Sequence, residues 1–133
     1  MMEAGRIGIV SRSATLARDV ERQLSLFELG ASKVVCMPAP GMTHLELLKM
    51  FERHWGTDAV LLLGAIDARE EEACAEWIGR HMAKPVVGFI DEAGAGHPQV
   101  ARLRACGVHM SRDAESIGAL TASLVGCPWL PFD

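Results

Sequence analysis

Short apolar runs alternate with amphipathic stretches along almost the whole chain. Five runs have the length of buried strands, at residues 6–10, 33–37, 58–64, 84–90 and 108–110. The run from Ala59 to Leu63 is apolar at every position, which is typical of a parallel strand that is covered on both faces. Between the runs, apolar residues recur at helical spacing, and this pattern predicts a helix after each strand.

Polar residues and glycines mark the expected ends of these helices. The first helix is expected from Thr15 to Leu29, with Gly30 ending it. Gly107 is expected to end the short fourth helix. The residues expected to open or cap the other four helices are Thr43, Asp67, Pro98, and either Ser111 or Asp113.

Strands that alternate with helices through short loops imply an α/β fold with a doubly wound parallel sheet. Right-handed crossovers favour the flavodoxin-like strand order 2-1-3-4-5, with helices on both faces of five strands. We expect one domain over residues 1–133, with a core at about 6–125. The apolar tail at 126–133 is expected to dock on the domain or on a partner.

Composition and charge exclude several classes of protein. Half of the 133 residues are hydrophobic and 23% are charged, which is too apolar for a disordered chain. The formal net charge is -4, without a basic run, so nucleic acid is not an expected partner. No apolar run approaches the ~20 residues of a membrane span, and residues 1–5 do not resemble a signal peptide. We therefore expect a cytoplasmic protein.

The cysteines give no sign of a metal site. They are widely spaced, and no CxxC or neighbouring histidine pair accompanies them. We interpret them as buried free thiols and expect neither a disulfide framework nor a metal. The four are Cys36, Cys74, Cys106 and Cys127.

The turn after the first strand is the first candidate site. In a sheet of this order, ligands bind at the carboxyl ends of strands 1 and 3. Ser11, Arg12, Ser13 and Thr15 supply hydroxyls, a cation and backbone N–H groups at a helix start, which can hold a phosphate or carboxylate. A plain helix cap explains the same residues equally well.

His97 is the second candidate, because it lies in a glycine-bracketed loop on the same side of the sheet. Its imidazole could accept a phosphoryl group or carry a proton. A helix N-terminal or surface histidine is the favoured alternative, since no carboxylate is placed to orient the ring. We interpret His44, His54 and His81 as surface residues of helices.

A flavin or nucleotide site is a third, disfavoured alternative. The segment from Ser11 to Thr15 is faintly similar to a flavodoxin phosphate loop. The chain has no tyrosine, however, and none of its three tryptophans falls at the carboxyl end of an expected strand.

Six segments resemble, in order, the second domain of succinyl-CoA synthetase α subunits, and together they extend from about Arg6 to Val125. The matches are residues 6–16 with GxVSRSGTLT, 41–43 and 47–52 with NGTxFxDxLxxFExD, 70–78 with EEEAAEWI, 84–90 with KPVVAFI, 105–109 with AAGVHV, and 114–118 with PAEIG.

The resemblance implies an acid–thiol ligase of the nucleoside-diphosphate-forming type, which exchanges phosphate, acid and CoA through a phosphohistidine. In the family, a CoA-binding domain precedes this one, and a β subunit brings an ATP-grasp domain. We therefore expect no cofactor on this chain alone. CoA and ATP or GTP with magnesium would act only through CoA-binding and ATP-grasp partners, and a homo-oligomer is a further expectation.

Three departures from the family pattern concern the chemistry. Ala65 stands where the family's GEIGG turn has a glutamate that contacts the phosphohistidine. The histidine loop is shorter here, and Gly96-His97 is followed by Pro98 where the family has GHAGA. Ala14 replaces the glycine of SRSGT, which adds a β-carbon where the backbone approaches phosphate.

These departures leave two hypotheses. The favoured one is a stand-alone ligase-type domain that is non-catalytic by itself and acts as a subunit-interaction or regulatory module of an acyl-CoA ligase. The alternative is a partner-dependent ligase subunit, in which His97 is phosphorylated and the turn from Ser11 to Thr15 binds the phosphoryl group. Losing the glutamate and the histidine loop would remove the pre-organised electrostatics on which phosphoryl transfer depends.

Overall fold

A parallel five-stranded sheet forms the centre of the computed structural model, which describes residues 5–90 and 98–125. Its order is β2-β1-β3-β4-β5, and every neighbouring pair is parallel. The expected flavodoxin-like order is therefore confirmed. The strands are β1 (Ile7–Ser11), β2 (Ala31–Cys36), β3 (Ala59–Leu63), β4 (Val86–Phe89) and β5 (His109–Met110).

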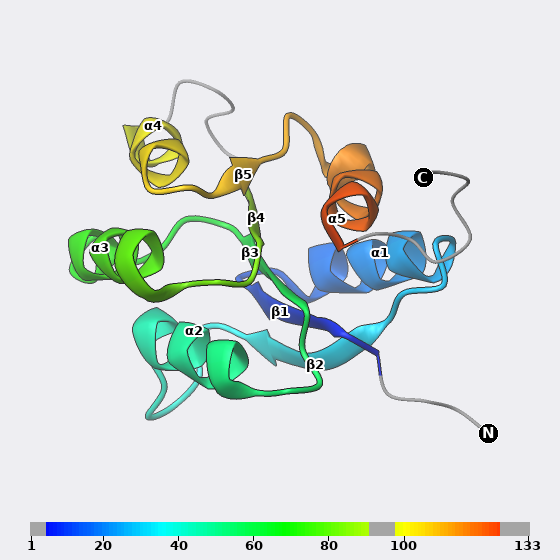
Figure 1. Ribbon diagram of the computed structural model, residues 1–133, viewed down its shortest axis with the longest axis horizontal. Helices are drawn as coiled ribbons and strands as arrows, with labels where there is room; N and C mark the ends of the chain where they lie inside the picture. The colour runs from blue at the N-terminus through cyan, green and yellow to red at the C-terminus, as the bar shows by residue number, and fades with distance from the viewer. Residues whose placement is uncertain (1–4, 91–97, 126–133) are drawn as a thin grey trace.

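Helices cover both faces of the sheet, as expected (Figure 1). Helices α1 and α5 pack together on one face, whereas α3 packs against both α2 and α4 on the other. A short 3-10 turn, η2 (Ala114–Ser116), precedes the last helix. The helices are α1 (Ala14–Ser25), α2 (His44–Arg53), α3 (Glu71–His81), α4 (Pro98–Ala105) and α5 (Ile117–Val125).

The central strands are buried along their whole length, which explains their continuous apolar sequences. All five residues of β1 and of β3 are buried. Successive side chains of a strand point to opposite faces, so Val10 and Leu62 pack with α2 and α3, whereas Ile9 and Leu61 pack with α1 and α5. The alternation divides the core into two layers.

Gly8 has no side chain, and this allows α2 to pack close to the sheet. A β-carbon at Gly8 would lie 2.6 Å from two ring atoms of Phe51, and Phe51 is itself only 1% exposed. The ring thus occupies the space that any side chain at position 8 would need.

Helix α1 ends earlier than its apolar pattern predicts. Its last residue is Ser25, and Leu26 is the C-cap. Glu28 has a φ of 58°, so the backbone turns before Leu29. Gly30 does not end the helix as expected, because it lies four residues beyond the C-cap. Its carbonyl accepts the N–H groups of Arg6 and Ile7 at 2.8 and 3.0 Å.

Other helix ends follow the sequence signals. Thr43 caps α2 in a capping box with Glu46, and Pro98 begins α4. Gly107 follows α4 with a φ of 106°. Of the two candidates for the last cap, Asp113 accepts the N–H of Ser116 at 2.9 Å.

Only part of the cysteine interpretation is correct. Cys74 is buried, and burial raises the pKa of its thiol to about 12. Cys106 is half-buried, but Cys36 is exposed because β2 lies at the edge of the sheet. Cys127 and the apolar tail lie outside the described residues.

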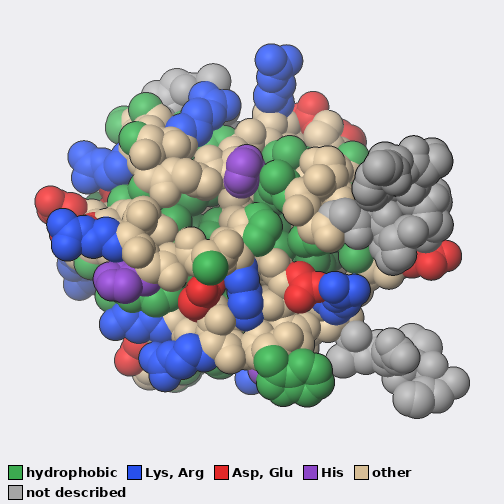
Figure 2. Space-filling model, viewed as in Figure 1, with side chains coloured by type: hydrophobic (Ala, Val, Ile, Leu, Met, Phe, Trp, Pro, Cys, Tyr) green, Lys and Arg blue, Asp and Glu red, His purple; other side chains and the backbone are tan. Residues whose placement is uncertain are grey.

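Within residues 5–90 and 98–125, no helix is both long and apolar enough to cross a membrane. The same residues contain no cluster of three histidine, cysteine or acidic side chains that could hold a metal ion. On the face seen in Figure 2, basic and acidic side chains are interspersed, and no single basic stripe is present.

Candidate functional site

The turn after β1 lies at the switch point between β1 and β3, as predicted. Ser11 is fully buried there. Its hydroxyl donates to the carbonyl of Ser13 at 2.7 Å and accepts the N–H of Ser13 at 3.0 Å. The Ser11 side chain therefore shapes the turn from within.

The start of α1 leaves hydrogen-bond donors free. The Ser13 hydroxyl accepts the N–H of Leu16 at 3.1 Å, and the Ser13 carbonyl accepts the N–H of Ala17 at 3.0 Å. Within the described part of the chain, the N–H groups of Ala14 and Thr15 have no hydrogen-bond partner. Free N–H groups at the positive end of a helix are suited to an anion. Ser13 thus acts as a cap, and the anion interpretation also stays open.

Arg12 links this turn to the loop after β3. Its Nε donates to the carbonyl of Ala65 at 2.5 Å. Its aliphatic stem lies over Gly64, where an added β-carbon would be 3.1 Å from the Arg12 Cβ. Gly64 has a φ of 96°, a conformation that suits glycine. The guanidinium is exposed at the edge of the sheet where ligands are expected.

Gln99 fixes the same loop from the opposite side. Its amide accepts the N–H of Ile66 at 2.7 Å and donates to the Ile66 carbonyl at 2.9 Å. Gln99 is buried, with 3% of its surface exposed. The sequence gives no signal for this role beyond a polar residue in the first turn of a short helix.

Asp67 does not cap α3, contrary to expectation. Its carboxylate accepts the N–H of Arg69 at 2.9 Å and pairs with the Arg69 side chain. These hydrogen bonds lower the pKa of Asp67. The helix begins later, with Glu70 as N-cap residue.

The acidic residues at the start of α3, Glu70, Glu71 and Glu72, are not all solvated. Glu70 makes no side-chain cap bond to its own helix. Its carboxylate instead accepts the N–H groups of His44 and Leu45 at 3.4 and 3.3 Å. Glu71 pairs with Arg102 of α4 at 3.3 Å. Two of the three acidic residues therefore tie α3 to its neighbours.

His44 is buried, so its interpretation as a surface residue is wrong. It is 3% exposed, and its Nδ1 lies 3.6 Å from Oε2 of Glu70. Burial lowers the pKa of His44, although the nearby Glu70 opposes the shift. His54 and His81 are exposed, as expected.

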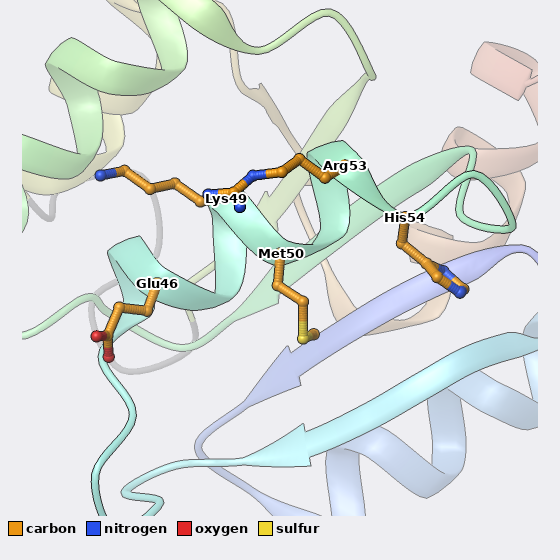
Figure 3. A pocket seen from close by; sticks show the side chains of 5 residues that line it. All are labelled: Glu46, Lys49, Met50, Arg53 and His54. Carbon is orange, nitrogen blue, oxygen red and sulfur yellow. The ribbon is translucent and has the colours of Figure 1, made fainter.

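A surface hollow of about 420 Å³ lies along α2, away from the predicted site residues. Figure 3 shows Met50 and His54 pointing to one side of the helix, with Lys49 and Arg53 on another. The ring of His54 also contacts the Thr57 hydroxyl at 2.8 Å.

The remaining predicted site residue, His97, lies outside the described residues.

No family model matches the chain. Similar sequences are found among succinate–CoA ligase [ADP-forming] α subunits. The α subunit of Aquifex aeolicus is 39% identical over 106 residues, which is 77% of this chain and 34% of that protein. The α subunit 1 of Archaeoglobus fulgidus is 40% identical over 123 residues, covering 90% of this chain and 41% of that protein.

A third relative, the α subunit of Staphylococcus aureus, is 33% identical over 137 aligned positions that cover 86% of this chain and 45% of that protein. The chain thus spans less than half the length of these curated relatives. Over most of its own length it is homologous to them, and the resemblance inferred from the sequence motifs is confirmed.

Solved structures show the same fold at low sequence identity. An ATP citrate lyase of Methanosaeta concilii matches 98% of this chain and 28% of its own, with a TM-score of 0.76 and 15% identity. The dinucleotide-forming acetyl-coenzyme A synthetase 1 of Ca. Korarchaeum cryptofilum matches 98% of this chain and 31% of its own, with a TM-score of 0.75 and 17% identity.

Proposed function

We propose that this homologue of one part of the succinate–CoA ligase α subunit does not perform ligase chemistry by itself, and that it serves an acyl-CoA ligase as a subunit-interaction or regulatory module. The supporting observation is the loop after β3. Ala65 stands at the family's glutamate position, Asp67 pairs with Arg69, and the Glu70 carboxylate bonds to the start of α2. Each carboxylate of this loop already has a partner.

The physical reason is that a phosphohistidine needs an oriented ring. A histidine becomes a good acceptor when a carboxylate or carbonyl holds its second nitrogen. Phosphoryl transfer otherwise relies on positioning and electrostatic stabilisation, with little help from other chemistry. A loop without a free carboxylate can neither orient the histidine ring nor stabilise its charge. CoA, nucleotide and magnesium would be bound by the CoA-binding and ATP-grasp partners.

The part of the site that we propose to remain is an anion site at the start of α1. The free N–H groups of Ala14 and Thr15 would bind a phosphate, together with the Arg12 guanidinium and the Ser13 and Thr15 hydroxyls. Ser11 would contribute by holding the turn.

Inorganic phosphate is expected to shift the backbone amide signals of Ala14 and Thr15 in an NMR titration at low ionic strength. Replacing Arg12 by glutamine should weaken binding roughly threefold to tenfold, because one exposed charge-assisted contact is lost. Arg18→Gln is the matched control, since Arg18 is an exposed residue of the same helix. Unshifted amides in the wild type would rule out the anion site.

The second candidate function is a partner-dependent ligase subunit with His97 as the phosphoryl acceptor. The homology to ligase α subunits and the free donors at α1 favour it. With ATP, magnesium and an ATP-grasp subunit of a succinate–CoA ligase, we expect the chain to acquire no acid-labile phosphate.

Label on the wild-type chain that disappears in His97→Asn would establish the second candidate and overturn the first. Label that appears only in an Ala65→Glu variant would instead identify the missing carboxylate as the reason for inactivity. Glu72→Gln is a suitable control, because Glu72 is exposed on α3.

A further inference from the structure

The first turn of α2 meets the start of α3 at the buried His44 and the partly exposed Glu70. His44 is the first residue of α2, and Glu70 is the N-cap residue of α3. Nδ1 of His44 is buried and has no hydrogen-bond partner among the described residues. Its 3.6 Å separation from Oε2 of Glu70 is too long for a hydrogen bond. A polar ring atom is thus held next to a carboxylate without bonding to it.

The same carboxylate is the link between the two helices. Its two oxygens accept the N–H groups of His44 and Leu45. These N–H groups lie in the first turn of α2, so no carbonyl of the helix can accept them. At 3.4 and 3.3 Å these bonds are long. A stronger donor placed beside Glu70 would therefore compete with them.

We propose that His44 and Glu70 form a proton-sensitive latch between α2 and α3, in which protonation of the His44 ring transfers the Glu70 carboxylate from the α2 backbone to the imidazolium. In the neutral state, Glu70 accepts the backbone N–H groups of His44 and Leu45, and the His44 ring does not bond to Glu70. In the protonated state, Nδ1–H donates to Oε2 and the bonds from His44 and Leu45 weaken. This inference does not depend on the proposed function.

Three charged groups from two neighbouring segments influence the protonation of the His44 ring. Glu70 and Asp67, from the loop before α3, favour the imidazolium, whereas Arg12 from the turn after β1 disfavours it. Burial is the largest influence, and it lowers the pKa of His44 below 6.5. Burial and the Glu70 carboxylate raise the pKa of the Cys74 thiol to about 12, so this thiol stays neutral over the same pH range.

The lowered pKa fixes the direction of the effect on stability. Between the pKa of the folded state and the unfolded value of 6.5, the unfolded chain binds more protons than the folded chain. The free energy of unfolding therefore falls as the pH drops through this window, and this loss is absent above it. The loop between β2 and α2, at the ligand edge of the sheet, would loosen at acidic pH.

An NMR titration of the wild-type protein from pH 8 to pH 5 tests the latch. The His44 ring signals should titrate with a midpoint below 6.5, and the backbone amides of His44 and Leu45 should shift with the same midpoint. Hydrogen exchange at these two amides, corrected for the intrinsic effect of pH, should become severalfold faster on acidification. A midpoint at or above 6.5, or amides that do not follow the ring, would overturn the proposal.

Two variants separate the latch from general acid effects. Glu70→Gln keeps an acceptor for the backbone but removes the charge, so the His44 midpoint should move to still lower pH. His54→Gln changes an exposed residue after the other end of α2 and should leave the His44 titration as it is. An unchanged midpoint in Glu70→Gln would also overturn the proposal. The wild-type titration decides the matter even if Glu70→Gln does not fold.

Discussion

Replacing Phe51 by alanine is expected to lower the free energy of unfolding by about 3–5 kcal/mol, because it removes a fully buried aromatic ring and leaves a cavity. The ring is 1% exposed and fills the space between α2 and β1. Urea unfolding followed by circular dichroism would measure the change. Arg53→Ala, on an exposed part of the same helix, should change stability by no more than about 0.5 kcal/mol.

The contact between Phe51 and Gly8 makes this prediction more specific. Gly8→Ala alone should destabilise the protein by about 1–3 kcal/mol, because its β-carbon overlaps the ring. Combining it with Phe51→Leu should cost less than the sum of the two single changes, with a coupling of roughly 0.5–3 kcal/mol. Strictly additive effects would show that the two positions do not share the same space.

Replacing Gln99 by leucine is expected to cost about 2–5 kcal/mol, because the N–H and the carbonyl of Ile66 would both lose their partner in a buried position. Ile66 is 3% exposed, and both bonds from Gln99 are shorter than 3.0 Å. The loop that carries Ala65 should then open more often, and hydrogen exchange at the Ile66 amide should become faster as the free energy of opening falls.

Arg102→Ala is the control for this prediction, since it changes an exposed residue of the same helix, α4, and breaks a partly exposed ion pair with Glu71. A Gln99→Leu protein as stable as the wild type would mean that water satisfies Ile66, and that Gln99 does not hold the loop.

Most of the fold could be predicted because its signals are local. The apolar runs predicted all five strands of the sheet, and the right-handedness of crossovers predicted their order. The cap at Thr43 follows from residues three positions apart. The end of α1 could not be predicted in this way. Leu26, Phe27 and Leu29 continue the apolar pattern beyond Ser25, but Glu28 adopts a left-handed conformation and Leu29 packs in the core.

Only the part of the candidate site formed by residues adjacent in the sequence could be predicted. Ser13 and Arg12 lie next to the turn that they form, and the sequence shows that turn directly. Glu70 meets His44 across 26 residues of sequence, and Gln99 meets Ile66 across 33. Neither pair has a characteristic spacing, so a buried histidine looked like a surface one and a loop-fixing glutamine went unnoticed.

The position of β1 between two other strands has a consequence for synthesis on the ribosome. Ile7 pairs with Ala31 on one side and with Ala59 on the other. At translation rates of about 5–20 residues per second, roughly fifty residues separate the first strand from its second partner, a delay of about 3–10 s. During that interval one hydrogen-bonding edge of a strand that is fully buried in the folded protein stays uncovered. The nascent chain should therefore depend on a chaperone that holds unfolded segments, or on slow translation after β3. A chain whose first strand lies at the edge of its sheet should depend on them less.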